Sequence, residues 1–137
     1  MKRLICLAAL GIASAGVASA DEQYYTNIED AGRLTDQHAW KFESDSVTRQ
    51  GDMVRFDVKT GWKNAETRPE TEAPARIVRY LAKCDSKELA LMAVAVIDNS
   101  RRVVKSFGIA PGAWDWAPPE KGTPEAQLLD KACSTRM

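Results

Sequence analysis

The sequence has 137 residues and carries 19 basic against 19 acidic side chains, with one histidine. This length suits one domain with a modest core. The balanced charge excludes the basic excess that marks most nucleic-acid-binding proteins, so no nucleic-acid partner is expected.

Residues 1–20 have the pattern of a cleaved export signal. Lys2 and Arg3 give a positive start, an apolar stretch rich in small residues follows, and an A-x-A motif ends at Ala20. We therefore expect cleavage between Ala20 and Asp21. A membrane anchor is the alternative, but the apolar stretch is short for a span of about 20 residues.

The mature chain is expected to be exported, to the periplasm or to the cell surface and medium, without stable membrane insertion. Cys6 follows the charged residues directly, with no apolar run ahead of it, so lipid attachment there is not expected. The remaining 117 residues hold 17 basic and 19 acidic side chains, since Lys2 and Arg3 leave with the leader.

Two cysteines remain after cleavage, Cys84 and Cys133. In an oxidising compartment such a pair is expected to form a disulfide. Free or metal-bound thiols are the alternative, but two distant thiols and one histidine supply few soft ligands. No metal and no other cofactor is therefore expected.

Residues 21–37 are polar and predict a flexible N-terminal arm, with a turn of helix around residues 27–33. Its aromatic residues, Tyr24 and Tyr25, either pack on the domain or contact a partner. His38 stands just before the first strand without a partner in any motif, so we expect a surface or capping residue without chemistry.

Two strands follow the arm. Trp40 and Phe42 alternate with charged residues, which predicts a strand over residues 40–43. Residues 44–52 are expected to turn the chain. Residues 53–62 then alternate cleanly, with apolar side chains on one face and charged ones on the other, as in a half-buried antiparallel strand. Residues 63–74 form a charged loop with two prolines.

Residues 75–84 predict a third strand that ends at Cys84. Its cations, Arg76, Arg79 and Lys83, are the nearest approach to a basic cluster in the sequence. We expect these cations to lie on a solvent-exposed strand face, and the alternative is that they form a ligand-binding site.

The apolar run from Leu89 to Ile97 predicts a central strand covered on both faces, although a buried helix has a similar composition. A tight turn at residues 98–101 leads into a strand over residues 103–107. The spacing predicts a meander of about five antiparallel strands.

Trp114 and Trp116 lie in a segment broken by glycine and proline, residues 108–119. They either cover an end of the core or form an aromatic patch for a partner or a sugar. A C-terminal helix then starts at the N-cap Thr123 and Pro124. Its predicted buried face contains Ala126, Leu129 and Cys133 at positions i, i+3 and i+7, with Leu128 and Ala132 beside it. The predicted fold class is α+β: one antiparallel sheet with this helix tied to it by the disulfide.

Motifs for catalysis are absent from the sequence. There is no glycine-rich phosphate loop, no nucleophile elbow and no zinc-protease signature. No catalytic residue is assigned, and a non-enzymatic protein is expected.

Several segments together resemble a known family. A strand led by Trp40, the segment YLAKC, the turn and strand IDNSRRVVKSF and the ending WAPPEKGTPEAQLLDKAC are similar to the surface-adhesin protein E-like proteins, which are exported bacterial proteins. The resemblance covers roughly residues 40–133, within a domain that we place at residues 38–137. It implies a sheet of about six strands with a C-terminal helix held by the cysteine pair.

The resemblance also implies a protein-binding module that recognises host or envelope proteins and forms a homodimer. The founding protein is a lipoprotein, whereas this sequence has no lipid-attachment motif. A soluble periplasmic protein of housekeeping or stress type, which binds an envelope component or inhibits an enzyme, is therefore the alternative. No binding residue is carried over from the family, so Arg76, Arg79, Lys83, Trp114 and Trp116 are the binding candidates.

Overall fold

The computed structural model of the protein describes residues 24–135. The predicted leader and its cleavage point between Ala20 and Asp21 lie outside these residues. In chain order, the elements are α2 (Ile28–Ala31), β1 (His38–Gln50), β2 (Met53–Trp62), η1 (Ala65–Thr67), β3 (Ala75–Lys83), β4 (Glu88–Ile97), β5 (Val103–Gly108), η2 (Pro111–Ala113) and α3 (Pro124–Ser134).

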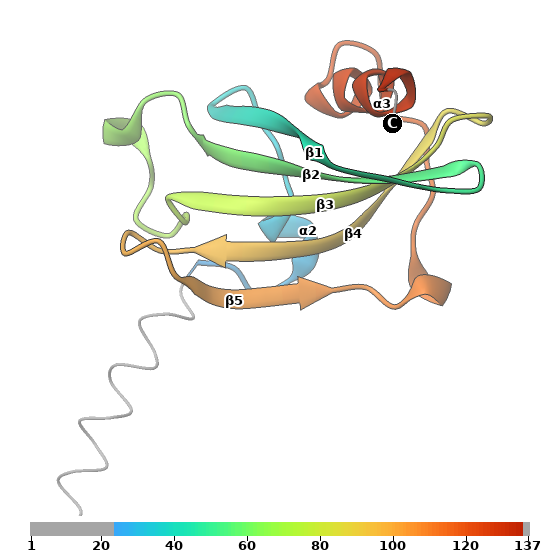
Figure 1. The fold of residues 1–137 in the computed structure, drawn as a ribbon. Helices are drawn as coiled ribbons and strands as arrows, with labels where there is room; N and C mark the ends of the chain where they lie inside the picture. Colours follow the sequence, from blue (N-terminus) through green and yellow to red (C-terminus); the bar gives the residue numbers. More distant parts are fainter. Residues whose placement is uncertain (1–23, 136–137) are drawn as a thin grey trace, which may run out of the picture.

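The five strands form one antiparallel sheet in the order β1-β2-β3-β4-β5, so each strand pairs with its neighbour in sequence (Figure 1). This meander, the C-terminal helix and the disulfide confirm the predicted α+β fold. β1 and β5 are the two edges of the sheet.

Strand β2 shows how the alternation of side chains divides the sheet into two faces. Val54, Phe56 and Val58 are fully buried, and Asp57 between them points to the other side. We call the side with the buried residues the core face and the opposite side the outer face.

Strand β1 is longer than predicted, because it continues through residues 44–50 to the turn at Gly51. Its pairing with β2 shifts between Glu43 and Thr48, which marks a β-bulge. The hydroxyl of Ser46 lies in this irregularity. It donates a hydrogen bond to the carbonyl of Glu43 at 2.6 Å and accepts one from the amide of Asp57 at 2.7 Å. Ser46 therefore satisfies backbone groups that the bulge leaves unpaired.

The run from Leu89 to Ile97 is a strand, as predicted, but it is covered on both faces only at its start, where Leu89 and Ala90 are both buried. Its register with β3 skips Met92, so that Leu91 and Val94 both point to the core face. Ala93 and Ala95 point to the outer face and are only half-buried. Alanine is small enough to leave this part of the outer face shallow.

The N-terminal segment, residues 24–37, packs on one end of the core face instead of forming a loose arm. Tyr25, Ala31 and Leu34 are buried there, and the amide of Ala73 donates to the hydroxyl of Tyr25 at 3.3 Å. α2 ends at Gly32, where a Cβ atom would lie only 2.8 Å from the side chain of Leu91. The helical turn expected near residues 27–33 is present in α2.

Helix α3 covers the other end of the core face. As predicted, the Thr123 hydroxyl caps its first turn and accepts a hydrogen bond from the amide of Ala126 at 3.2 Å. The buried face includes the predicted Leu129, but its centre is shifted towards Leu128 and Ala132, which were predicted to lie beside it. Ala126 and Cys133 lie at its border and are half-buried.

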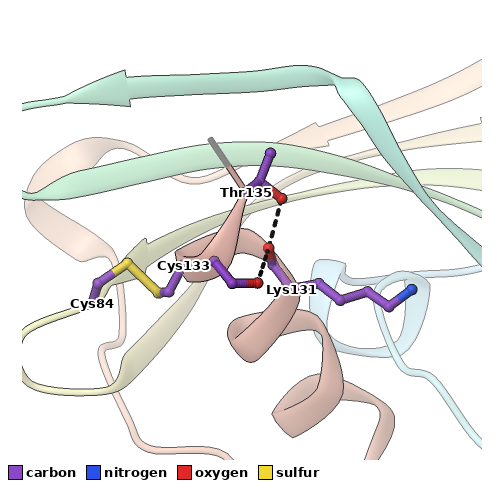
Figure 2. The surroundings of a disulfide bond; sticks show 5 residues. Cys84, Lys131, Cys133 and Thr135 are labelled. Carbon is purple, nitrogen blue, oxygen red and sulfur yellow. Dashed lines mark hydrogen bonds between the residues drawn. A yellow bond between two sulfur atoms is a disulfide. The ribbon is translucent and has the colours of Figure 1, made fainter. Parts of the chain in front are cut away.

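The disulfide between Cys84 and Cys133 joins the end of β3 to the last turn of α3, as predicted. Figure 2 shows this bond beside the C-terminal end of the helix, where the Thr135 hydroxyl donates to the carbonyl of Lys131 at 2.7 Å. The helix is therefore fixed covalently at its end and held by apolar packing along its length.

Candidate functional site

Arg76 is buried on the core face, with 2 % of its surface exposed, so its assignment to a solvated strand face was wrong. Nε donates to the hydroxyl of Thr60 at 3.2 Å. Nη1 donates to the carbonyls of Ala31 and Arg33 in the N-terminal segment, the latter at 2.9 Å. Burial lowers the pKa of Arg76. The guanidinium joins the N-terminal segment to the sheet and is not available to a partner.

His38 is also buried, which rules out the surface position, one of its two predicted roles. Its Nδ1 accepts a hydrogen bond from the amide of Thr35 at 2.9 Å, which is a capping role of the predicted kind. Its ring lies 4.5 Å from the ring of Trp62, centroid to centroid. Burial, and secondarily the charge of Arg76, lower the pKa of His38 to about 4.

Arg79 lies at the centre of the outer face, as predicted, but it is paired. Its Nε and Nη2 donate to the two carboxylate oxygens of Asp57, directly opposite on β2, at 2.7 and 3.0 Å. This hydrogen bonding raises the pKa of Arg79. Lys59 and Glu43 form a second ion pair at 3.0 Å on the same side.

A shallow hollow of about 280 Å³ lies beside the Asp57–Arg79 pair. We call its outward-facing part the outer patch. The outer patch consists of Asp57, Ile77, Arg79, Ala93, Ala95 and Ser106. It is mostly small and apolar, and the ion pair lies along one side of it.

Lys83 and the two tryptophans lie together at one end of the outer face. The ammonium of Lys83 is 4.2 Å from the ring centroid of Trp116, a cation–π contact. Trp114 meets Trp116 edge to face, and its indole donates to the carbonyl of Ile109 at 2.9 Å. Both rings are half-buried. They therefore pack along this end of the sheet.

The five candidate residues do not form one site. Arg76 lies on the core face, Arg79 in the outer patch, and Lys83 with the tryptophans beyond it. The segment that carries the tryptophans continues the sheet, because Ala117 exchanges two backbone hydrogen bonds with Leu89. Figure 1 shows it running from β5 towards α3 past the strand ends.

A second hollow, which the sequence did not indicate, opens on the core face where this segment turns into α3. We call it the inner cavity, and its volume is about 330 Å³. Tyr80 lines it with only 4 % of its surface exposed. Burial, and next the charge of Glu125, raise the pKa of Tyr80. The complete lining is Tyr80, Leu89, Leu91, Ala117, Pro118, Pro119, Glu120, Thr123 and Glu125.

The only sequence signal for the inner cavity is the position of Tyr80 on the core face of β3. Residues 117–125 form the other wall of the cavity. No local sequence pattern specifies where this segment packs against the sheet. Within residues 24–135 there is no group of three metal-binding side chains, and none of the helices in that range is long and apolar enough to cross a membrane.

The fold and these surfaces define a small α+β module in which a sheet, backed on one face, presents two hollows. The family model of surface-adhesin protein E matches residues 25–134. The protein belongs to this family of surface adhesins, which confirms the resemblance inferred from the sequence.

Among solved structures, the crystal structure of protein E from non-typeable Haemophilus influenzae is similar to the chain. The two share 14% sequence identity over 74% of each chain, with a TM-score of 0.47. A comparison with curated protein sequences gives no significant match.

Proposed function

We propose that the protein is a non-catalytic, exported module that binds a partner protein through the outer patch. The family supports an adhesin-like role. One observation selects the outer patch as the binding surface. Two hydrogen bonds to Asp57 hold Arg79 in place there, beside the half-buried side chains of Ile77 and the alanines.

The outer patch is suited to binding because of its composition and because its side chains lose little conformational entropy when a partner binds. Protein interfaces combine an apolar centre with a polar rim, and the outer patch has both. A flexible arginine loses rotamer entropy when a partner immobilises it, but Arg79 is already fixed by a bidentate pair. The small side chains of Ala93 and Ala95 let a partner approach the sheet closely.

The disulfide supports export, because such bonds persist in oxidising compartments. Fractionation of the producing cells distinguishes the two cellular roles. Recovery from the medium or the outer membrane supports an adhesin that binds host proteins. Recovery solely by osmotic shock instead supports a soluble periplasmic protein that binds an envelope component or inhibits an enzyme.

A pull-down with the disulfide-bonded exported chain tests the binding surface. The panel contains matrix proteins, serum proteins and an extract of the bacterial envelope. The variant Ala95→Lys places a long charged side chain in the outer patch and should weaken capture at least tenfold. Ala65→Lys, at an exposed position in η1, is the matched control and should bind as the wild type does. Equal capture by Ala95→Lys and wild type would exclude the outer patch.

A further inference from the structure

The inner cavity lies between the two covers of the core face. Leu91 forms part of its floor and also touches the end of α2 at Gly32. Thr123 and Glu125 at the start of α3 form the opposite side, and Pro118 and Pro119 form a wall. At about 330 Å³ it is at the small end of the range for ligand pockets, which suits a single side chain.

The floor of the inner cavity carries a polar group that lacks a partner. Tyr80 has 4 % of its surface exposed and packs against Phe56, with ring centroids 5.6 Å apart. Its hydroxyl makes no hydrogen bond to any residue between 24 and 135, whereas the buried hydroxyl of Tyr25 is bonded to Ala73. Tyr80 lines the inner cavity, and its hydroxyl does not belong to the fully buried side-chain atoms without a partner, which in the described residues are His38 Nε2 and Arg76 Nη2. The hydroxyl therefore faces accessible space, where its unused hydrogen-bonding capacity is available to a ligand.

The charge of the inner cavity has one sign. Glu120 and Glu125 line it, and none of the described lining residues is cationic. The nearby lysines, Lys87 and Lys121, line a separate hollow on the other side of the two prolines. The cavity therefore presents two carboxylates and a hydroxyl above a floor of leucines.

We propose that the inner cavity binds a basic side chain, arginine or lysine, of a partner polypeptide. The aliphatic stem of such a side chain packs on Leu89, Leu91 and the prolines, as long cationic side chains do on apolar surface. Its charged end donates hydrogen bonds to the carboxylates of Glu120 and Glu125 and to the oxygen of Tyr80. Bonds of this charge-assisted kind are stronger than neutral ones.

The source of the side chain, a partner protein, rests on the proposed function. The chemistry of the cavity does not, so small probes test it alone. Nitrogen-15 NMR of the disulfide-bonded chain is recorded during titration with N-acetyl-arginine methylamide, with N-acetyl-lysine methylamide, and with the neutral citrulline analogue. Both cations should shift the amide signals of Leu89, Thr123 and Glu125, and citrulline should shift them at least tenfold less at equal concentration.

Three variants make the test specific. Glu125→Gln should weaken binding of the arginine probe about tenfold, since it removes one charged partner. Tyr80→Phe keeps the packing with Phe56 and should weaken binding several-fold without lowering thermal stability. Glu66→Gln, in the exposed loop element η1, is the control and should bind as the wild type does.

Equal shifts with citrulline, or unchanged binding in both Glu125→Gln and Tyr80→Phe, would overturn the proposal. Partner capture that survives in Glu125→Gln but is lost in Ala95→Lys would leave the proposed function standing and exclude a role for the cavity in it. Probe binding without any captured protein would support the cavity and count against the proposed function.

Discussion

Arg76 is a single side chain that joins two layers of the protein. Its guanidinium donates to Thr60 on β2 and to two carbonyls of the N-terminal segment. Those carbonyls lie at the end of α2 and just beyond it, where helix carbonyls lack partners within the helix. Backbone oxygens of the segment that Arg76 holds thus solvate one side of the buried charge, while Nη2 is buried without a hydrogen-bond partner among the described residues.

Replacing Arg76 by methionine should destabilise the protein by about 3 kcal/mol, because it fills the space but leaves buried acceptors without donors. Urea unfolding at neutral pH measures the change. Arg49→Met on the exposed part of β1 is the matched control and should change stability by less than about 0.5 kcal/mol. If both variants unfold at the same urea concentration, Arg76 does not anchor the segment.

His38 should make stability depend on pH in the mildly acidic range. Its pKa is about 4 in the folded protein and 6.5 in the reference state, so the unfolded chain binds more protons between these values. Stability therefore falls as the pH drops from about 6.5 to about 4. The full shift corresponds to a loss of about 3 kcal/mol. Unfolding by urea at pH 7, 5.5 and 4.5 measures it.

The variant His38→Asn isolates this contribution, because an amide oxygen accepts the Thr35 hydrogen bond but does not titrate. Glu72 works in the opposite direction: burial raises its pKa, so its protonation favours the folded state as the pH falls. Glu72 is present in both proteins, so the difference between their pH profiles reports His38. Parallel profiles would show that His38 titrates normally in the fold.

Among the secondary-structure elements, strands with regular alternation of apolar and polar residues are predicted best from the sequence. β2 has an uninterrupted pattern of buried and exposed side chains, and its predicted bounds match the structure. The bulges in β1 and at Met92 in β4 could not be predicted, because each depends on pairing with another strand. The length of β1 and the open outer side of β4 around Ala93 and Ala95 were missed for that reason.

Arg76 was misplaced although the sequence contained the signal. Counting back from Cys84 in steps of two gives Ala82, Tyr80, Val78 and then Arg76, all of which point to the core face. The charge of Arg76 favoured a solvent-exposed position, whereas the alternation of side chains along the strand placed it on the buried face. The inner cavity has no comparable signal, because Tyr80 meets Glu125 only through the path of the intervening chain.

We expect the disulfide to supply much of the free energy that keeps α3 on the sheet. With 11 residues, the helix is too short to be stable alone. Cys84 and Cys133 are 49 residues apart, so in the chain-entropy model the bond contributes about 4 kcal/mol. The double variant Cys84→Ala/Cys133→Ala should lose about that much free energy of unfolding, together with helical circular dichroism.

Reduction provides the internal control for this expectation. Dithiothreitol should lower the stability of the wild type to that of the double variant and should leave the variant itself unchanged. An oxidised wild type no more stable than the variant would mean that packing of Leu128, Leu129 and Ala132 alone holds the helix.

At the scale of the whole molecule, one face of the sheet is covered by two elements that are fastened in different ways. The N-terminal segment is held at one end by the hydrogen bonds of Arg76, and α3 is held at the other end by the disulfide. Arg76 lies in β3 and Cys84 directly follows its last residue, eight positions further along the chain. At 3.3 Å per residue, this separation is about 26 Å.

This separation predicts that the two fastenings act independently. Energetic effects of sites more than about 10 Å apart, without shared partners, add within about 0.5 kcal/mol. Combining Arg76→Met with the loss of both cysteines should therefore destabilise the protein by the sum of the separate losses, as measured by urea unfolding. A total well below the sum would show that losing one cover already releases the other. The inner cavity, which lies between the covers, would then open whenever either fastening breaks.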